Sequence, residues 1–360
     1  MRLTDTIKKN RTSIVTYGVV ILAYVALQIL SSLGMLSRSM TGYLVPMCVY
    51  IVLAISLNLV VGISGELSLG HAGFMGVGAF VGIVTATCLQ TAVASEFLRL
   101  LLAMVVGGIF AGIAGVIVGV PVLRLRGDYL AIVTLAFGEI LRNIIGNMYV
   151  GLDQDGLRIA MNEEAIHLHD GGKMIIKGAL GAAGVQKLST FFMGFLLVMF
   201  TLFVVLNIVN SKEGRAIKAV RDNRIAAESV GINVTAFRLK AFVVSAILAG
   251  MAGALFGLNM GSLQASKFDY NTSIDILVYV VLGGMGNILG SIISTIVLYL
   301  IPELLRGMDK FRMILYAVVL IVVMLCTWSP KVKSALQVAK EAIKTKLASV
   351  LKKKEAGQNG

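Results

Sequence analysis

Long apolar runs without a single charged residue restrict the fold of this chain more than any other feature. They include residues 12–37, 39–65, 100–123, 241–266, 276–302 and 313–330. About 20 apolar residues cross a bilayer as a helix, and inside lipid only helices and closed barrels satisfy their backbone polar groups. Because the runs lack the polar–apolar alternation of a barrel strand, they predict an all-α polytopic integral membrane protein.

Composition excludes several other classes of protein. Only 14% of the 360 residues are charged, against about a quarter in soluble domains. The net charge of +13 comes from basic residues beside apolar runs, as the positive-inside rule expects, so it does not indicate nucleic-acid binding. Cys48, Cys88 and Cys326 lie within apolar runs and lack metal-ligand spacing. With no GxxxxGK[ST] motif and no nucleophile–base arrangement, neither an enzyme nor a cofactor is predicted.

The Lys and Arg residues predict the orientation of the spans. Four of them precede the first span, which places the N-terminus in the cytoplasm. The first seven predicted spans cover about 13–30, 43–61, 74–88, 98–123, 129–145, 190–209 and 241–261. Residues 146–189, which carry no positive excess, then form an external loop, and residues 210–240 form a cytoplasmic one.

The C-terminal third departs from a simple series of spans. Residues 273–305 are too long for one span and are interrupted by GGMGN at 283–287, which predicts a half-helix and a return helix. With a last span at about 313–328, the chain would have eight to ten transmembrane helices within a membrane domain of residues 1–330. A basic cytoplasmic tail, 331–360, carries eight lysines against two glutamates and suits contact with anionic lipid.

Two glycine-rich interruptions fall in halves of opposite predicted orientation. They are SGELSLGHAG at 64–73 and LGGMGNILG at 282–290. Paired broken helices in inverted halves indicate a transport pathway, although glycine-rich helix packing alone gives the same pattern, and the inverted repeat stays open. The predicted pathway residues are Ser68, Gly70, His71, Gly73, Gly283, Gly284 and Gly286.

A few polar residues fall within or beside the predicted spans, where polar groups are usually functional. Glu66 lies at the predicted cytoplasmic edge and is interpreted as interfacial. For His71, a structural hydrogen bond and a pathway contact remain open. Glu139 and Arg142 share a helix face, which favours an ion pair over a proton relay. Asp275 is interpreted as a cap of the half-helix.

The cytoplasmic loop at 210–240 is a basic island that carries seven Lys or Arg residues against three acids. Asp222 or Asn223 can cap a helix at about 224–230, which Gly231 can end. Ala226 and Ala227 would give this helix a small, smooth face. The rim of that face comprises Arg221, Arg224 and Glu228.

Two interpretations of the island compete. An interfacial amphipathic helix needs large apolar anchors, and the island helix is interpreted as short and without them. The pattern therefore favours docking to a soluble cytoplasmic partner, as in a transporter that is driven by a separate subunit.

Four stretches resemble the LivM-type permease subunit of branched-chain amino acid ABC importers. They are NLVVGISGELSLGHAGFMGVGAF (58–80), RLRGDYLAIVTLAFGEILRNI (124–144), EGRAIKAVRDNRIAAESVGINVTAFRLKAFVVSAILAGMAGALFG (213–257) and SIDILVYVVLGGMGNILGSII (273–293). They occur in the order of that family. The external segment 151–187 and the end of the last span match it less well.

The resemblance implies a transport subunit of a prokaryotic plasma (inner) membrane. Its partners would be a second permease in a heterodimer, two cytoplasmic ATPases and an external substrate-binding protein. The residues implied to couple to the ATPases are Glu213, Gly214, Arg221, Arg224, Ala226, Ala227, Glu228 and Gly231. Two alternatives remain, namely an ion-coupled secondary transporter that uses Glu139 or His71, and an ABC permease for urea or short amides.

Overall fold

Apolar helices form most of the chain in the computed structural model. The structure describes residues 3–35, 37–123, 129–153, 156–166 and 172–304, with isolated residues 314, 317, 318 and 321. The chain divides into two compact units, Met1–Ile296 and Val297–Gly360. Arg124, Arg126, the tail 331–360 and nearly all of the predicted last span lie outside the described residues.

Seven of the described helices are long and apolar enough to cross a membrane, which confirms the polytopic helical class. A π-helix, η1 (Leu59–Ser64), continues the second of them, so that this span runs from Met40 to Ser64. The seven overlap the predicted spans, although α1 begins ten residues and α9 seven residues before the predicted start. They are α1 (Leu3–Ser32), α2 (Arg38–Asn58), α3 (His71–Cys88), α4 (Glu96–Val122), α5 (Tyr129–Gly146), α6 (Phe191–Asn210) and α9 (Val234–Gly257).

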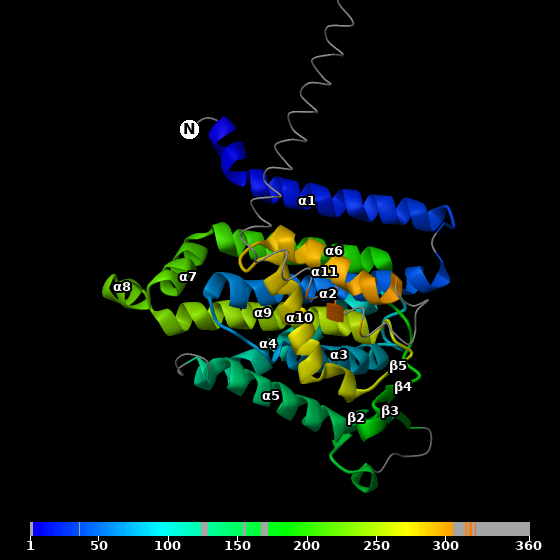
Figure 1. The fold of residues 1–360 in the computed structure, drawn as a ribbon. Helices are drawn as coiled ribbons and strands as arrows, with labels where there is room; N and C mark the ends of the chain where they lie inside the picture. The colour runs from blue at the N-terminus through cyan, green and yellow to red at the C-terminus, as the bar shows by residue number, and fades with distance from the viewer. Residues whose placement is uncertain are drawn as a thin grey trace, which may run out of the picture. The chain divides into compact units, whose positions relative to one another are not determined.

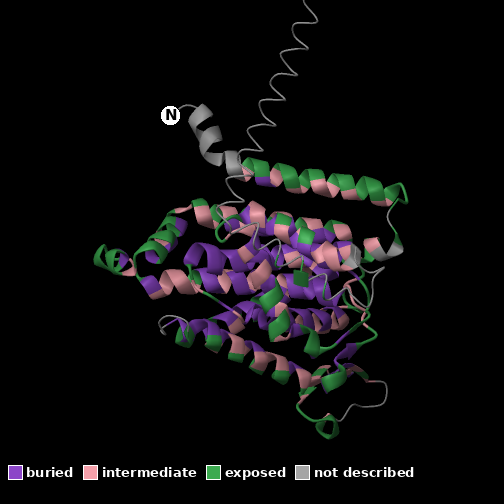
Figure 2. Ribbon diagram, in the orientation of Figure 1, coloured by how far each residue is buried: buried purple, intermediate pink, exposed green. Residues whose placement is uncertain are grey.

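The core is built where α3, α4 and α9 approach one another closely. A Cβ at Gly78 of α3 would overlap the backbone of Gly250 in α9, and a Cβ at Gly107 of α4 would lie 2.8 Å from the carbonyl oxygen of Gly78. Small residues allow such contact between membrane helices, where apolar burial alone gives little attraction. Figure 2 shows the buried residues concentrated along α2, α3 and α9.

Helix α1 has the opposite character and is largely exposed (Figure 2). Only 11% of its span is buried. Its main aromatic contact is Tyr24, whose ring stacks on Phe195 of α6 at a centroid distance of 4.0 Å. An apolar helix with this exposure suits contact with lipid or with another membrane subunit.

The GGMGN sequence ends one helix and precedes another, as predicted. Helix α10 (Tyr270–Gly283) is 14 residues long, and α11 begins at Ile288 and ends at Leu304. At 1.5 Å per residue, α10 is about 20 Å long, too short to cross a bilayer of about 30 Å. It is therefore the predicted half-helix.

The predicted external segment forms a sheet, which the sequence analysis did not anticipate. Strands β1 (Tyr149–Asp153), β2 (Gly156–Ala160), β3 (Lys173–Lys177), β4 (Ala182–Ala183) and β5 (Ser262–Leu263) pair in the antiparallel order β2-β1-β3-β4-β5. Short 3₁₀ turns flank them as η2 (Glu163–Ala165), η3 (Gly178–Leu180) and η4 (Ala265–Phe268). The last strand comes from beyond α9, so local sequence patterns do not reveal the pairing.

The basic island contains two helices rather than the single predicted one. Helix α7 (Lys212–Asp222) precedes α8 (Arg224–Ser229). Figure 1 shows both at one end of the helical bundle, which we call the island end, and the strands at the opposite end, which we call the sheet end. The missed helix α7 has an N-cap in Ser211, whose hydroxyl accepts a hydrogen bond from the amide of Gly214 at 3.2 Å.

Candidate functional site

The caps predicted for the short island helix are present. The Asn223 side chain accepts a hydrogen bond from the amide of Ala226 at 3.0 Å, which begins α8. Beyond the end of this helix, Gly231 has φ +81° and its amide bonds to the carbonyl of Glu228. This left-handed conformation favours glycine, so the predicted stop at Gly231 is confirmed.

Ala226 and Ala227 do not share the single exposed face that their sequence pattern predicts. Ala227 is buried and packs in a small apolar cluster with Val220 of α7 and Val234 of α9, whereas Ala226 is exposed. The reason is that α8 folds back on α7, and this contact buries one side of the short helix. The two alanines therefore point to different environments.

Two large apolar side chains are exposed on this part of the island. Ile225 is 80% exposed and Val230 is 75% exposed. The sequence analysis described this helix as lacking large apolar anchors, and the structure contradicts that description. Both side chains lie outside the membrane spans, and we call Ile225, Ala226 and Val230 the α8 surface.

Most of the predicted coupling residues brace the island internally. Glu213 forms an ion pair with Lys240 of α9, and Arg224 pairs with Glu228 at 3.0 Å along α8. Gly214 is buried, and a Cβ there would overlap the carbonyls at the end of α6. These contacts fix α7 and α8 on the ends of α6 and α9.

Arg221 does not rim the docking face as predicted. Its Nη1 donates a hydrogen bond of 2.7 Å to the carbonyl of Gly62 in η1. Gly65 has φ +78°, and a Cβ there would lie 2.5 Å from the Arg221 side chain. The glycine therefore leaves room for an arginine that joins the island to the first glycine-rich interruption.

Asn58, a residue that sequence reasoning missed, joins the end of α2 to the second glycine-rich interruption and the start of α11. Its Oδ1 accepts a hydrogen bond from the amide of Gly286, and its Nδ2 donates one to Ser291, both at 2.8 Å. Gly286 itself has φ +83°. A buried asparagine at the end of an apolar run was the available signal, because a buried polar group requires partners.

The other predicted pathway residues occupy packed positions. A Cβ at Gly70 would overlap Thr134 of α5, and one at Gly73 would lie 2.9 Å from the Cα of Gly138. Ser68 is buried, and its hydroxyl has no hydrogen-bond partner among the described residues. These contacts show how the first interruption is held against α5; the pathway role stays a prediction.

His71 and Glu66 each make a definite contact beside this interruption. The Nε2 atom of His71 lies 2.9 Å from the hydroxyl of Ser56, and both residues are buried. Glu66 forms an ion pair of 2.8 Å with Arg238 of α9. Burial raises the pKa of the Glu66 carboxyl above its ordinary value, although Arg238 and Arg224 act in the opposite direction.

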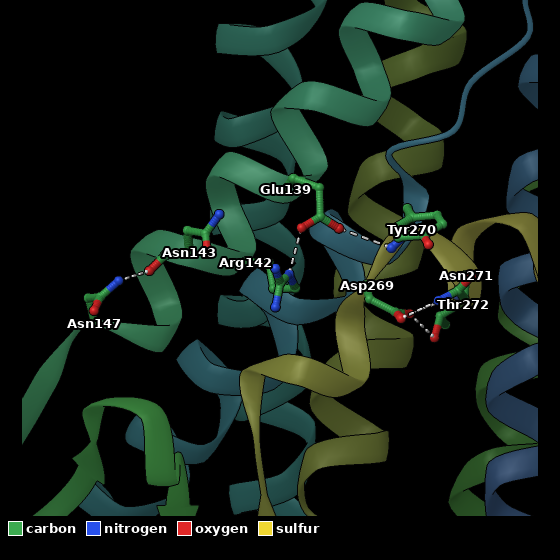
Figure 3. Close-up of polar contacts among 8 residues, drawn as sticks. All are labelled: Glu139, Arg142, Asn143, Asn147, Asp269, Tyr270, Asn271 and Thr272. Atoms are coloured by element: carbon green, nitrogen blue, oxygen red, sulfur yellow. Dashed lines mark hydrogen bonds and ion pairs between the residues drawn. The ribbon is translucent and has the colours of Figure 1, made fainter.

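The predicted ion pair on α5 is confirmed and has a further partner. Arg142 donates to Glu139 Oε2 at 2.7 Å, and Glu139 Oε1 accepts from the amide of Tyr270 at 3.1 Å (Figure 3). Asp269 caps α10 by accepting from the amide of Thr272. The prediction that Asp275 caps this helix is therefore wrong, because α10 begins five residues earlier than Asp275.

A hollow of about 440 Å³ lies beside the start of α10. Its lining includes the charged residues Lys267, Asp269 and Asp275. Helices α2, α3 and α9 contribute Tyr50, Met75 and Phe256. We call this space the α10 hollow.

A comparison with known protein families identifies one family that matches most of this helical bundle, including the island and both interruptions. The family described as branched-chain amino acid transport system / permease component matches residues 39–327, which include every helix from α3 to α11. The chain belongs to this permease family. It is accordingly a membrane transport subunit and not an enzyme.

Individual relatives support the same assignment. The chain is 32% identical over 315 residues to the high-affinity branched-chain amino acid transport system permease protein LivM of Salmonella typhimurium, covering 82% of this chain and 70% of that protein. It is 33% identical to LivM of Escherichia coli with the same coverage. The L-arabinose ABC transporter permease protein AraH of Azospirillum brasilense is 28% identical over 77% of this chain and 72% of its own length. No solved structure gives a significant match.

Proposed function

We propose that this chain is one permease half of an ATP-driven importer of branched-chain or related apolar amino acids. It would work with a second permease, two cytoplasmic ATPases and an external substrate-binding protein, in a prokaryotic inner membrane with both termini cytoplasmic. The family membership and the branched-chain amino acids named for the LivM relatives support this proposal. The structural observation that carries it is the α8 surface at the island end.

The α8 surface has the properties of a docking element for an ATPase. It presents Ile225 and Val230 outside the membrane spans, where water makes their exposure unfavourable by about 2 kcal/mol each. Because Arg224, Glu228 and Glu213 are already engaged within the island, the surface is preorganised. A partner with an apolar groove would cover it without having to order it first.

The island also connects to the spans that a transporter has to move. It joins α6 to α9, and Arg221 joins it to η1. Asn58 then links the end of α2 to the break between α10 and α11. A displacement of the island by an ATPase would therefore reach η1 through Arg221 and the second glycine-rich interruption through Asn58.

Ile225→Asp tests the proposal. The residue is 80% exposed, so the substitution leaves the fold of the chain intact. It should reduce co-purification of the ATPases by about a hundredfold, because it removes an apolar contact and brings a charge into the interface. Leucine uptake by cells carrying the complete importer should fall with it.

A matched control uses the same substitution at the opposite end of the molecule. Ile159 of β2 is 63% exposed, and Ile159→Asp should retain the ATPases. Normal ATPase binding and normal uptake in the Ile225→Asp importer would refute docking at the α8 surface. An uptake panel that includes isoleucine, valine, urea, L-arabinose and fructose would identify the substrate class.

The ion-coupled alternative finds no support in the structure or in the relatives. Glu139 is held by Arg142 and by the amide of Tyr270, which leaves it poorly suited to exchange a proton or cation. His71 is buried against Ser56. The relatives are components of transport systems with separate subunits.

A further inference from the structure

The α10 hollow reaches the middle of the span that α2 forms. Tyr50 lines it and occupies the eleventh position of the span Met40–Ser64, which has 25 residues. The Tyr50 ring meets Tyr279 of α10 edge-on at a centroid distance of 6.1 Å. Helix α10 therefore passes beside the middle of α2 at Tyr279, and Asp275 precedes that level by one helical turn, or about 6 Å.

Asp275 is the residue in this hollow that most needs an explanation. It lies within the apolar helix α10 and is exposed in the single chain. Among the described residues, its carboxylate makes no hydrogen bond or ion pair. An exposed carboxylate at this depth is unstable against lipid, so its environment in the assembled protein must be water-filled or polar.

The two charged residues near Asp275 differ in whether their side chains already have bonding partners. Asp269 accepts hydrogen bonds from Thr272 and Asn271 and is committed to capping α10 (Figure 3). Within the described part of the chain, the Lys267 ammonium forms no ion pair. The hollow thus offers one uncommitted anion, one uncommitted cation and the apolar side chains of Met75 and Phe256.

We propose that the α10 hollow is a transient site for the transported amino acid, with Asp275 receiving its ammonium group and Lys267 its carboxylate. This inference rests on the proposed importer function and adds the location of the cargo. The volume falls within the range of small-molecule sites, and Met75 and Phe256 suit an apolar side chain. Weak, partly hydrated binding is appropriate, since cargo has to leave the site again.

The proposed site differs from the predicted glycine pathway. Gly70 and Gly73 are packed against α5, and the hydroxyl of Ser273 on α10 accepts a hydrogen bond from the amide of Ala72 at 3.0 Å. The Ala72–Ser273 bond joins α3 to α10 beside these glycines. The cargo would therefore pass along the exposed side of α10, which carries Asp275, and the glycines would support that wall from behind.

Thiol accessibility tests the location without depending on transport. Asp275→Cys is introduced into a chain whose Cys48, Cys88 and Cys326 are replaced by alanine, and the complete importer is placed in proteoliposomes. A water-soluble thiosulfonate should modify the introduced thiol at least tenfold faster than it modifies a cysteine that faces lipid, because the hollow admits water. A lipid-facing control is Ile113→Cys on α4, where the residue is 52% exposed. Equal, slow reaction at positions 275 and 113 would overturn the inference.

Transport kinetics test the assigned role of the carboxylate. Asp275→Asn should lower the maximal rate of leucine uptake at least tenfold, whereas Asp275→Glu should retain half or more of it. The matched control is Glu164→Gln, which removes one negative charge from an exposed turn at the sheet end. It should leave the rate of leucine uptake unchanged. Wild-type uptake by Asp275→Asn would also overturn the inference. Co-purification of the ATPases is measured in parallel. If the wild-type chain fails to co-purify with them, the importer function itself is refuted.

Discussion

The guanidinium of Arg221 joins two parts of the chain that are 159 residues apart in sequence. Its acceptor, the carbonyl of Gly62, belongs to a buried π-helix, a local form that is frequent at functional sites. A charged donor on a buried carbonyl contributes about 1.5–3 kcal/mol. At the residue scale, this contact links the island to the span formed by α2 and η1.

Arg221→Ala should separate docking from transport. The ATPases should still co-purify, because the α8 surface is untouched, while leucine uptake and the stimulation of ATP hydrolysis by loaded binding protein fall about tenfold. Lys218→Ala is the control, since it removes another exposed cation from α7. Equal behaviour of the two variants would show that the Gly62 contact carries no coupling.

At the scale of secondary-structure elements, the break between α10 and α11 depends on two adjacent glycines with different roles. Gly284 has φ +93°, with only Asn287 near a hypothetical Cβ, at 3.7 Å. At Gly283, by contrast, a Cβ would overlap the backbone of α11 at Gly290 and Ser291. One glycine therefore provides a backbone conformation, and its neighbour provides close contact between two helices.

Gly283→Ala and Gly284→Ala should consequently differ. The change at 284 forces an L-residue into a left-handed conformation, which is unfavourable by about 1–2 kcal/mol, and should lower Tm by a few degrees while uptake persists. The change at 283 pushes α10 away from α11 and should abolish uptake. Thermal denaturation in detergent and leucine uptake measure both effects. The reverse ranking would mean that the helix contact is dispensable.

At the scale of the whole molecule, the sheet end and the island end define an axis across the membrane. The proposed orientation places the sheet outside and the island in the cytoplasm, as the basic residues of the island favour. Leu180 in η3 is 69% exposed, and Arg215 in α7 is also exposed. These two positions can report the orientation directly.

An impermeant thiol reagent should therefore label Leu180→Cys in intact cells or spheroplasts. Arg215→Cys should react only after the membrane is opened. The background again lacks Cys48, Cys88 and Cys326. Labelling of position 215 from outside would show that the orientation is the reverse of the proposed one, and cytoplasmic docking at the island would then lose its basis.

Features with a local physical cause could be predicted from the sequence. Spans follow from the length of apolar runs, because a bilayer sets that length. The start and stop of α8 follow from Asn223 and Gly231, which act on their own helix. The break at GGMGN follows from glycines that permit unusual backbone angles.

Features that depend on distant partners could not be predicted in this way. Ala227 is buried because α8 folds onto α7, and the helical pattern of α8 alone does not contain that contact. Arg221 turns away from the rim because Gly62 and Gly65 lie beside it. Asp275 is not the cap of α10, because the helix begins at Tyr270 and Asp269 takes that role.

The antiparallel pairing of β4 with β5 has a consequence for biosynthesis. Roughly 80 residues, including all of α6 to α9, separate Ala183 from Ser262, so a ribosome needs about 4–16 s to produce the second strand after the first. During that interval β4 has an unpaired edge. Because β4 is only two residues long, it offers little template for aggregation, and the sheet closes only once α9 has emerged and been inserted.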